Sequence, residues 1–173
     1  MLTSQLIGPE RHSELDLVRA LFREYGLELA IDLCFQGFEE ELKNLPGKYT
    51  LPLGELRLYY SDMDLVGCGA FRPLNTDTAE LKRIYVRPEF RGRGFGREIT
   101  LGLIKACEAA GYRVIRLDTL RRLVPAVNLY RNLGFIEIEA YNETPIDDVV
   151  YMEYQVQKPL YTIEDQEPEV PTT

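Results

Sequence analysis

An unusual hexapeptide, Arg91-Gly92-Arg93-Gly94-Phe95-Gly96, lies between a predicted strand and a predicted helix. The first backbone N–H groups of a helix are unpaired and carry partial positive charge, so a phosphate binds there favourably. The three glycines leave the backbone open to a phosphate, and Arg91, Arg93 and Arg97 add charge and forked donors. The hexapeptide therefore predicts an anion site between a strand and a helix.

Two common phosphate-binding motifs fit this loop poorly. A dinucleotide fingerprint that begins at Gly92 requires glycine at position 97 and finds Arg97, and a Walker A loop requires Gly-Lys followed by Ser or Thr. From the loop alone, a tight glycine-rich turn with solvated arginines stays open as the alternative.

Composition excludes several classes of protein. A length of 173 residues fits one domain, and a net charge of −8 disfavours nucleic-acid binding. No apolar run approaches the roughly 20 residues that span a bilayer, and the N-terminus lacks a secretory pattern, so we expect a cytoplasmic protein without a membrane partner. With one histidine and three dispersed cysteines, no metal site is expected. A basic cluster runs against the acidic trend: Lys82, Arg83, Arg87, Arg91, Arg93 and Arg97.

The periodicity of apolar residues predicts alternating helices and strands. A first strand at residues 3–7 precedes a helix capped by Ser13 and ending at Gly26, an extended stretch at 27–35 and a helix at 38–45. Strands follow at 55–60, 65–71 and 80–86, then a helix at 94–110, a strand at 114–119, a helix at 125–133 and strands at 135–138 and 149–156. The order is β-α-α-β-β-β-α-β-α-β-β.

The segment from Val86 to Gly96 resembles the coenzyme A pyrophosphate loop of the GNAT acyltransferase family, which has Arg or Gln, two residues, Gly, one residue, then Gly or Ala. About forty residues downstream, the segment from Pro125 to Phe135 resembles that family's second signature, with its Ala, Leu-Tyr and Gly-Phe in register. Phe35-Gln36-Gly37-Phe38, with Glu41-Leu42 and Leu45-Pro46-Gly47, is similar to a segment of a bacterial subset with poorly defined substrates.

The resemblance implies an α/β (α+β) GNAT fold, with a central mixed, mostly antiparallel sheet flanked by helices. It implies one acyltransferase domain over residues 1–157, followed by an acidic tail at 158–173 that we expect to be disordered.

The implied activity is direct transfer of an acetyl group from acetyl-CoA to a primary amine of a small molecule or amino acid, with no covalent enzyme intermediate. The resemblance assigns cofactor contacts to the backbone of Ile84, Tyr85 and Val86, to the loop from Arg91 to Arg97, and to Asn128. It assigns protonation of the leaving sulfur to Tyr130, for which a role in packing against the sheet stays open.

The acceptor side is less defined. Glu80 is the first candidate to take the amine proton, and Asp118 is the second. By analogy with the family, Gln36, Tyr141 and Asn142 flank the acceptor, although ordinary loop packing also explains them. A non-catalytic acyl-CoA-binding module and an enzyme acting on protein N-termini or lysines remain alternatives, and a homodimer stays open.

Overall fold

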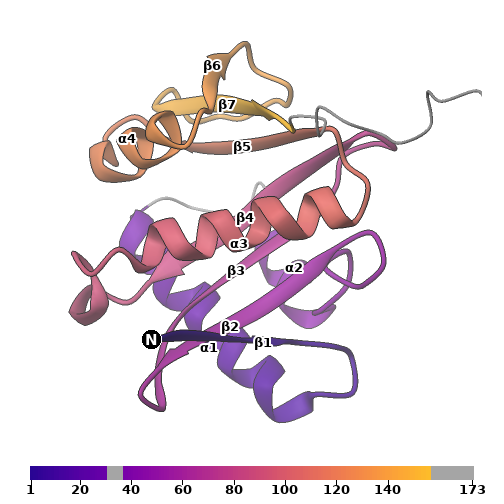
Figure 1. The fold of residues 1–173 in the computed structure, drawn as a ribbon, viewed down its shortest axis with the longest axis vertical. Helices are drawn as coiled ribbons and strands as arrows, with labels where there is room; N and C mark the ends of the chain where they lie inside the picture. Colours follow the sequence, from indigo (N-terminus) through magenta and orange to yellow (C-terminus); the bar gives the residue numbers. More distant parts are fainter. Residues whose placement is uncertain (31–36, 157–173) are drawn as a thin grey trace, which may run out of the picture.

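The computed structural model describes residues 1–30 and 37–156, which form a seven-stranded sheet in the order β1-β2-β3-β4-β5-β7-β6 (Figure 1). The strands are β1 (Leu2–Leu6), β2 (Glu55–Ser61), β3 (Asp64–Pro73), β4 (Thr78–Val86), β5 (Val114–Leu120), β6 (Ile136–Ile138) and β7 (Val149–Gln155). The helices are α1 (His12–Leu29), α2 (Phe38–Lys43), α3 (Phe95–Ala109) and α4 (Val124–Asn132), with a 3-10 turn at Pro88–Phe90. The predicted order and fold class are confirmed.

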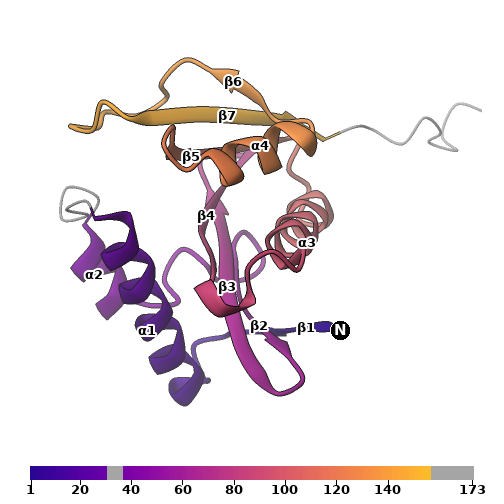
Figure 2. The ribbon, with the colours of Figure 1, turned by 90° about the vertical axis from the view of Figure 1, so that its left-hand side faces the viewer.

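Two helical layers enclose the first four strands (Figure 2). On one face, α1 and α2 cover a core that includes Phe22, Leu42 and Leu56. On the other face, α3 packs through Ile99, Leu103 and Cys107, which recur at helical spacing and are fully buried. The predicted face of this helix is thus confirmed.

The first helix differs from its prediction at both ends. Arg11 occupies the N-cap position, and the Ser13 hydroxyl donates to the Glu14 carboxylate at 2.6 Å instead of capping the helix. The helix continues past Gly26 to Leu29, because Leu29 is buried against the core, and Ala30 then adopts a left-handed conformation at φ 50°. The extended stretch expected from residue 27 is therefore wrong as far as Leu29, and its remainder after Ala30 lies outside the described residues.

The middle of the sheet carries the feature that positions the site. Between β3 and β4 the register shifts near Arg83, which takes a left-handed conformation at φ 56°, so β4 contains a β-bulge. The parallel pairing of β4 with β5 covers only Thr78–Glu80 against residues 114–116. Beyond Glu80 the two strands separate, and β5 continues paired with β7 alone.

In the described residues, Cys68 and Cys107 are both buried free thiols. No described helix combines the length and the apolar character that crossing a membrane requires. The acidic tail expected at 158–173, like Gln36 and Cys34, lies outside the described residues.

Candidate active site

A cavity of about 90 Å³ lies where β4 and β5 separate. The strands contribute residues from Leu81 to Ile84 and from Leu117 to Leu120, while α1 and α4 close the space with Tyr25 and Tyr130. We call this space the splay cavity. The pairing between β4 and β5 ends at Glu80, so the β4 backbone beyond this residue has no partner in β5.

Two tyrosine side chains reach the splay cavity from opposite helices. Tyr130 is buried and its ring meets the Phe135 ring edge-on at 5.8 Å, yet its hydroxyl has no hydrogen-bond partner among the described residues. Burial raises the pKa of Tyr130, and burial also raises the pKa of Tyr25 to about 12. Both phenols therefore stay protonated near neutral pH and can donate a hydrogen bond.

The loop before α3 is rich in available backbone donors. Gly92 and Gly94 have φ values of 76° and 83°, a region that suits glycine, and a Cβ on either residue would meet no atom within 4 Å. In the part of the chain that the structure describes, no N–H from Gly92 to Gly96 donates to a protein acceptor. These donors and the start of a fifteen-residue helix form an anion-binding geometry.

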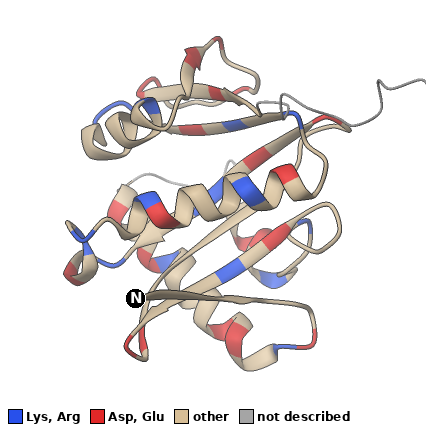
Figure 3. Cartoon of the chain, in the orientation of Figure 1, with Lys and Arg blue, Asp and Glu red and all other residues tan. Residues whose placement is uncertain are grey.

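The predicted basic cluster divides into two groups. Figure 3 shows Lys and Arg gathered on the loop that leads into α3. Arg87 and Arg91 there form ion pairs with Glu24 and Glu28 of α1, both at 2.7 Å. Lys82 and Arg83, by contrast, are buried within the sheet. The single patch expected from the sequence is therefore wrong, because alternation along β4 and its bulge turn the first two cations away from the loop.

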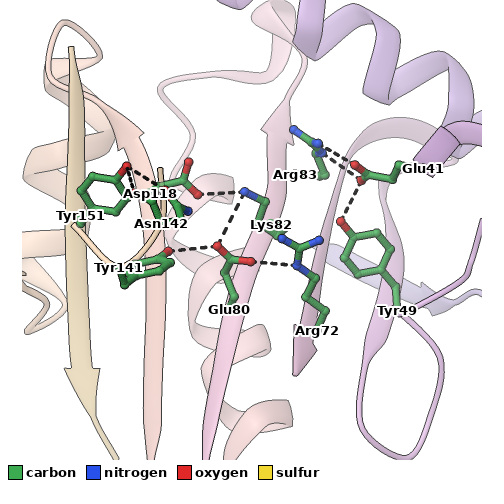
Figure 4. Close-up of polar contacts among 10 residues, drawn as sticks. All are labelled: Glu41, Tyr49, Arg72, Glu80, Lys82, Arg83, Asp118, Tyr141, Asn142 and Tyr151. Carbon is green, nitrogen blue, oxygen red and sulfur yellow. Dashed lines mark hydrogen bonds and ion pairs between the residues drawn. The ribbon is translucent and has the colours of Figure 1, made fainter. Parts of the chain in front are cut away.

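A second cavity of about 190 Å³, the acceptor cavity, shares Lys82, Arg83 and Asp118 with the splay cavity. Its remaining lining comes from α2, β3 and the segment before β7: Glu41, Arg72, Asn142, Glu143 and Thr144. Lys82 donates to Asp118 at 2.9 Å and lies 3.8 Å from Glu80 (Figure 4). The lysine and the aspartate thus stand at the junction of the two cavities.

Glu80 lies behind this junction. Its side chain is inaccessible, with 0 % of the residue exposed. One carboxylate oxygen accepts a hydrogen bond from Arg72 Nε at 2.8 Å, and the other accepts one from the Tyr141 hydroxyl at 3.0 Å (Figure 4). The Glu80 carboxylate therefore orients Arg72 and Tyr141. It does not line the acceptor cavity itself.

The bulge residue Arg83 is anchored to α2. Its Nε and a terminal nitrogen donate to the two oxygens of Glu41 at 3.0 and 2.6 Å, and its guanidinium lies 5.1 Å from the centre of the Phe38 ring. Tyr49 donates to the same carboxylate at 2.7 Å. Burial raises the pKa of the Glu41 carboxyl, but the hydrogen bonds and charge of Arg83 outweigh burial and leave that pKa lowered.

The other predicted site residues take varied positions. Ile84 lines the splay cavity, Tyr85 is buried against Tyr25, and the Val86 carbonyl accepts a bond from Arg91 Nε at 2.9 Å. Asn128 is exposed on α4. Asn142 lines the acceptor cavity and accepts a hydrogen bond from Tyr151 at 2.8 Å. Tyr141 lines neither cavity and donates to Glu80 behind them. The position of Gln36 lies outside the described residues.

Five residues at the site were not selected as site residues from the sequence: Tyr25, Glu41, Arg72, Lys82 and Arg83. A signal existed for the last two, since Lys82 and Arg83 are two adjacent cations in the middle of a predicted strand. Arg72 similarly follows the apolar run of β3. Charges within buried strands need partners, and such positions can be searched for in a sequence.

Comparison with known proteins gives a family match. The sequence model described as the acetyltransferase (GNAT) family matches residues 17–135. An uncharacterized N-acetyltransferase of Schizosaccharomyces pombe is 39% identical over 147 residues, covering 84% of this chain and 90% of the relative. An uncharacterized N-acetyltransferase of Dictyostelium discoideum is 28% identical, covering 85% of this chain and 97% of the relative.

Solved structures share the fold at low sequence identity. A GNAT-family acetyltransferase of Staphylococcus aureus superposes with a TM-score of 0.71 at 19% identity, covering 91% of this chain and all of that one. A putative acetyltransferase of Salmonella typhimurium, solved with its cofactor acetyl-CoA, superposes with a TM-score of 0.64 at 16% identity, covering 94% and 98%.

Proposed function

Because the chain belongs to the acetyltransferase (GNAT) family, we propose that it transfers the acetyl group of acetyl-CoA to a primary amine of a small molecule by direct attack. The observation that carries this proposal is the pair of adjoining cavities, which meet at Lys82, Arg83 and Asp118. One cavity follows the open edge of β4, and the other has a polar lining suited to an amine. That the chain is an acyltransferase enzyme follows from the family and from relatives named N-acetyltransferases.

The residues present fit acetyl-CoA as the cosubstrate. The free N–H groups from Gly92 to Gly96 suit a pyrophosphate, and the exposed Arg93 and Arg97 flank them. The unpaired backbone of β4 beyond Glu80 suits amide groups in an extended arm, since such groups can take the place of a neighbouring strand. When bound, acetyl-CoA supplies the activated thioester.

Tyr130 is the proposed acid for the departing sulfur. Tyr130 borders the splay cavity, its hydroxyl stays protonated because burial raises its pKa, and that hydroxyl makes no hydrogen bond to another described residue. This free hydroxyl supports the catalytic role over simple packing, for which a buried phenol would normally take a protein partner.

Asp118 is the proposed acceptor of the amine proton. It borders both cavities, whereas Glu80 is wholly buried behind Lys82 and Arg72. We therefore assign Glu80 a positioning role, in which it holds Arg72, Tyr141 and Lys82 in place. The amine must lose a proton before or during attack, and the carboxylate that reaches the cavity is better placed to receive it.

A small acceptor is favoured over a protein by the size of the site. The acceptor cavity has a volume of about 190 Å³ and is bounded by Asn142, Glu143 and Thr144 from the segment before β7. A protein N-terminus or lysine would need an open groove at this place.

The proposal is tested in two steps. Calorimetry should first detect acetyl-CoA binding, and a thiol-release assay with an amine panel should then detect acceptor-dependent turnover. Tyr130→Phe should lower kcat by about 10- to 100-fold while acetyl-CoA affinity changes by less than about threefold. Folded protein that binds no acetyl-CoA, or binds it without turnover on any amine, would reject the function. Unchanged kcat in Tyr130→Phe would reject only the acid role.

A further inference from the structure

The acceptor cavity contains three cationic side chains, and two of them are matched by carboxylates of the same cavity. Arg83 is paired with Glu41 through two hydrogen bonds, and Lys82 is paired with Asp118. The third cation, Arg72, is bound to Glu80, which lies behind the cavity and not in its lining. Arg72 therefore differs from the other two in what it offers to a bound molecule.

Arg72 is held on one side only. Its Nε donates to Glu80 at 2.8 Å, and no other hydrogen bond from its guanidinium to a described residue is recorded. In Figure 4 the dashed line from Arg72 to Glu80 starts at Nε, and neither terminal nitrogen carries a dashed line. The Arg72 side chain is 31% exposed, while the Glu80 side chain that fixes it is 1% exposed. The result is an oriented guanidinium with its outer edge available at the cavity.

From this arrangement we infer that Arg72 binds a carboxylate of the acceptor, so that the acceptor is an amino acid or another small amine that carries a carboxylate. The inference rests on the proposed function and narrows its substrate class. The two terminal nitrogens of a guanidinium match the two oxygens of a carboxylate in a planar, bidentate contact. The same contact would fix the distance from the carboxylate to the amine.

The remaining charges of the cavity suit a zwitterion. Asp118 and Glu143 offer carboxylates to an incoming ammonium group, and Glu143 has no ion pair among the described residues. A volume of about 190 Å³ is below the roughly 300–1,000 Å³ of pockets for drug-sized ligands, which restricts the acceptor to a small molecule. An amine without a carboxylate would leave the terminal nitrogens of Arg72 without a partner when it is bound. Sites built to hydrogen-bond a substrate group strongly reject analogues that lack that group.

The first test uses the unaltered protein. Thiol release is measured for a set of L-amino acids, for their decarboxylated amines and for their amides, each with saturating acetyl-CoA. We expect kcat/KM for the best amino acid to exceed that of its decarboxylated amine and its amide by about 100-fold or more. Equal or faster turnover of the decarboxylated amines would overturn the inference and leave the proposed function intact. Absence of turnover on every compound would instead remove the proposed function.

The second test assigns the contact to Arg72. Arg72→Gln should lower kcat/KM for the best amino acid by about 100-fold and for its decarboxylated amine by less than about tenfold. Arg113→Gln is the matched control, since Arg113 is 63% exposed in its side chain and pairs with Asp77 away from both cavities. Arg72→Lys keeps the charge opposite Glu80 and serves if the glutamine variant does not fold. Acetyl-CoA affinity reports folding in each variant, and an equal loss on both substrates in a folded variant would contradict the assignment.

Discussion

The pair of Arg83 and Glu41 allows a quantitative prediction, because it is buried and joins α2 to the bulge of β4. The side chains are 3% and 14% exposed, and two hydrogen bonds connect them. Glu41→Gln removes the negative charge and keeps the size of the side chain. The guanidinium stays buried but loses the negative charge of Glu41.

The magnitude follows from the cost of weakening a buried ion pair at one of its two partners. Removing one partner of a buried ion pair costs about 3–5 kcal/mol. The lower end applies here, because the glutamine oxygen can still accept one hydrogen bond and the Phe38 ring still lies beside the guanidinium. A loss of about 3 kcal/mol lowers the melting temperature of a protein of this length by about 6–12 °C.

Thermal unfolding followed by circular dichroism measures this change. Glu39→Gln provides the control, since Glu39 lies on the same helix, is exposed and has no ion pair in the described part of the chain. The control should shift the melting temperature by no more than about 2 °C. If Glu41→Gln also stayed within that interval, the contact between α2 and the bulge would not contribute the stability argued here.

Three further predictions concern acid stability and the loop before α3. The folded pKa of Glu41 is lowered, so its pairing stabilises the protein above the unfolded pKa of about 4.3, and this stabilisation is lost as pH falls through the folded pKa. Melting temperatures measured from pH 7 to pH 3 should therefore fall less steeply in Glu41→Gln than in the unaltered protein. Parallel curves for the two proteins would argue against this. Gly94→Ala should lower the melting temperature by about 2–8 °C, because alanine at φ 83° costs about 1–2 kcal/mol. Gly96→Ala should not lower it, because Gly96 has an ordinary helical conformation. Equal melting temperatures in the two variants would refute the conformational argument. Arg97→Gln should weaken acetyl-CoA binding by about three- to tenfold and reduce its dependence on salt in calorimetry; an unchanged salt dependence would place Arg97 away from the phosphates.

Periodicity was sufficient to predict the secondary structure in most of the fold. The buried face of α3 and the apolar runs of β2 and β3 are local patterns, and the structure confirms them as a buried helix face and two paired strands. The end of α1 was wrong, because burial of Leu29 against the core extends the helix past Gly26, whose low helix propensity suggested a stop. Tertiary packing decided that boundary.

The site was predictable where it depends on contiguous residues and not where it depends on pairing between strands. The loop from Arg91 to Gly96 was identified from its own sequence, with the geometry that an anion requires. By contrast, the contact between Arg72 and Glu80 depends on their facing positions in β3 and β4, and that register depends on the turn and on the packing of the whole hairpin. The bulge at Arg83 adds one residue and changes which side chains face α2, so closeness in the sequence alone wrongly grouped Lys82 and Arg83 with the arginines of the loop.

The separation of β4 from β5 gives this sheet an edge in its interior. Exposed strand edges tend to pair with other extended chains, and folded proteins usually place them at the periphery, where charges, bulges or covering segments protect them. Here the unpaired stretch lies between two strands of one sheet and is covered by Tyr25 and Tyr130 from flanking helices. The bulge in β4 adds local twist at the same place. This sheet can therefore keep a stretch of extended backbone unpaired on one side, where Tyr25 and Tyr130 shield it from pairing with another strand.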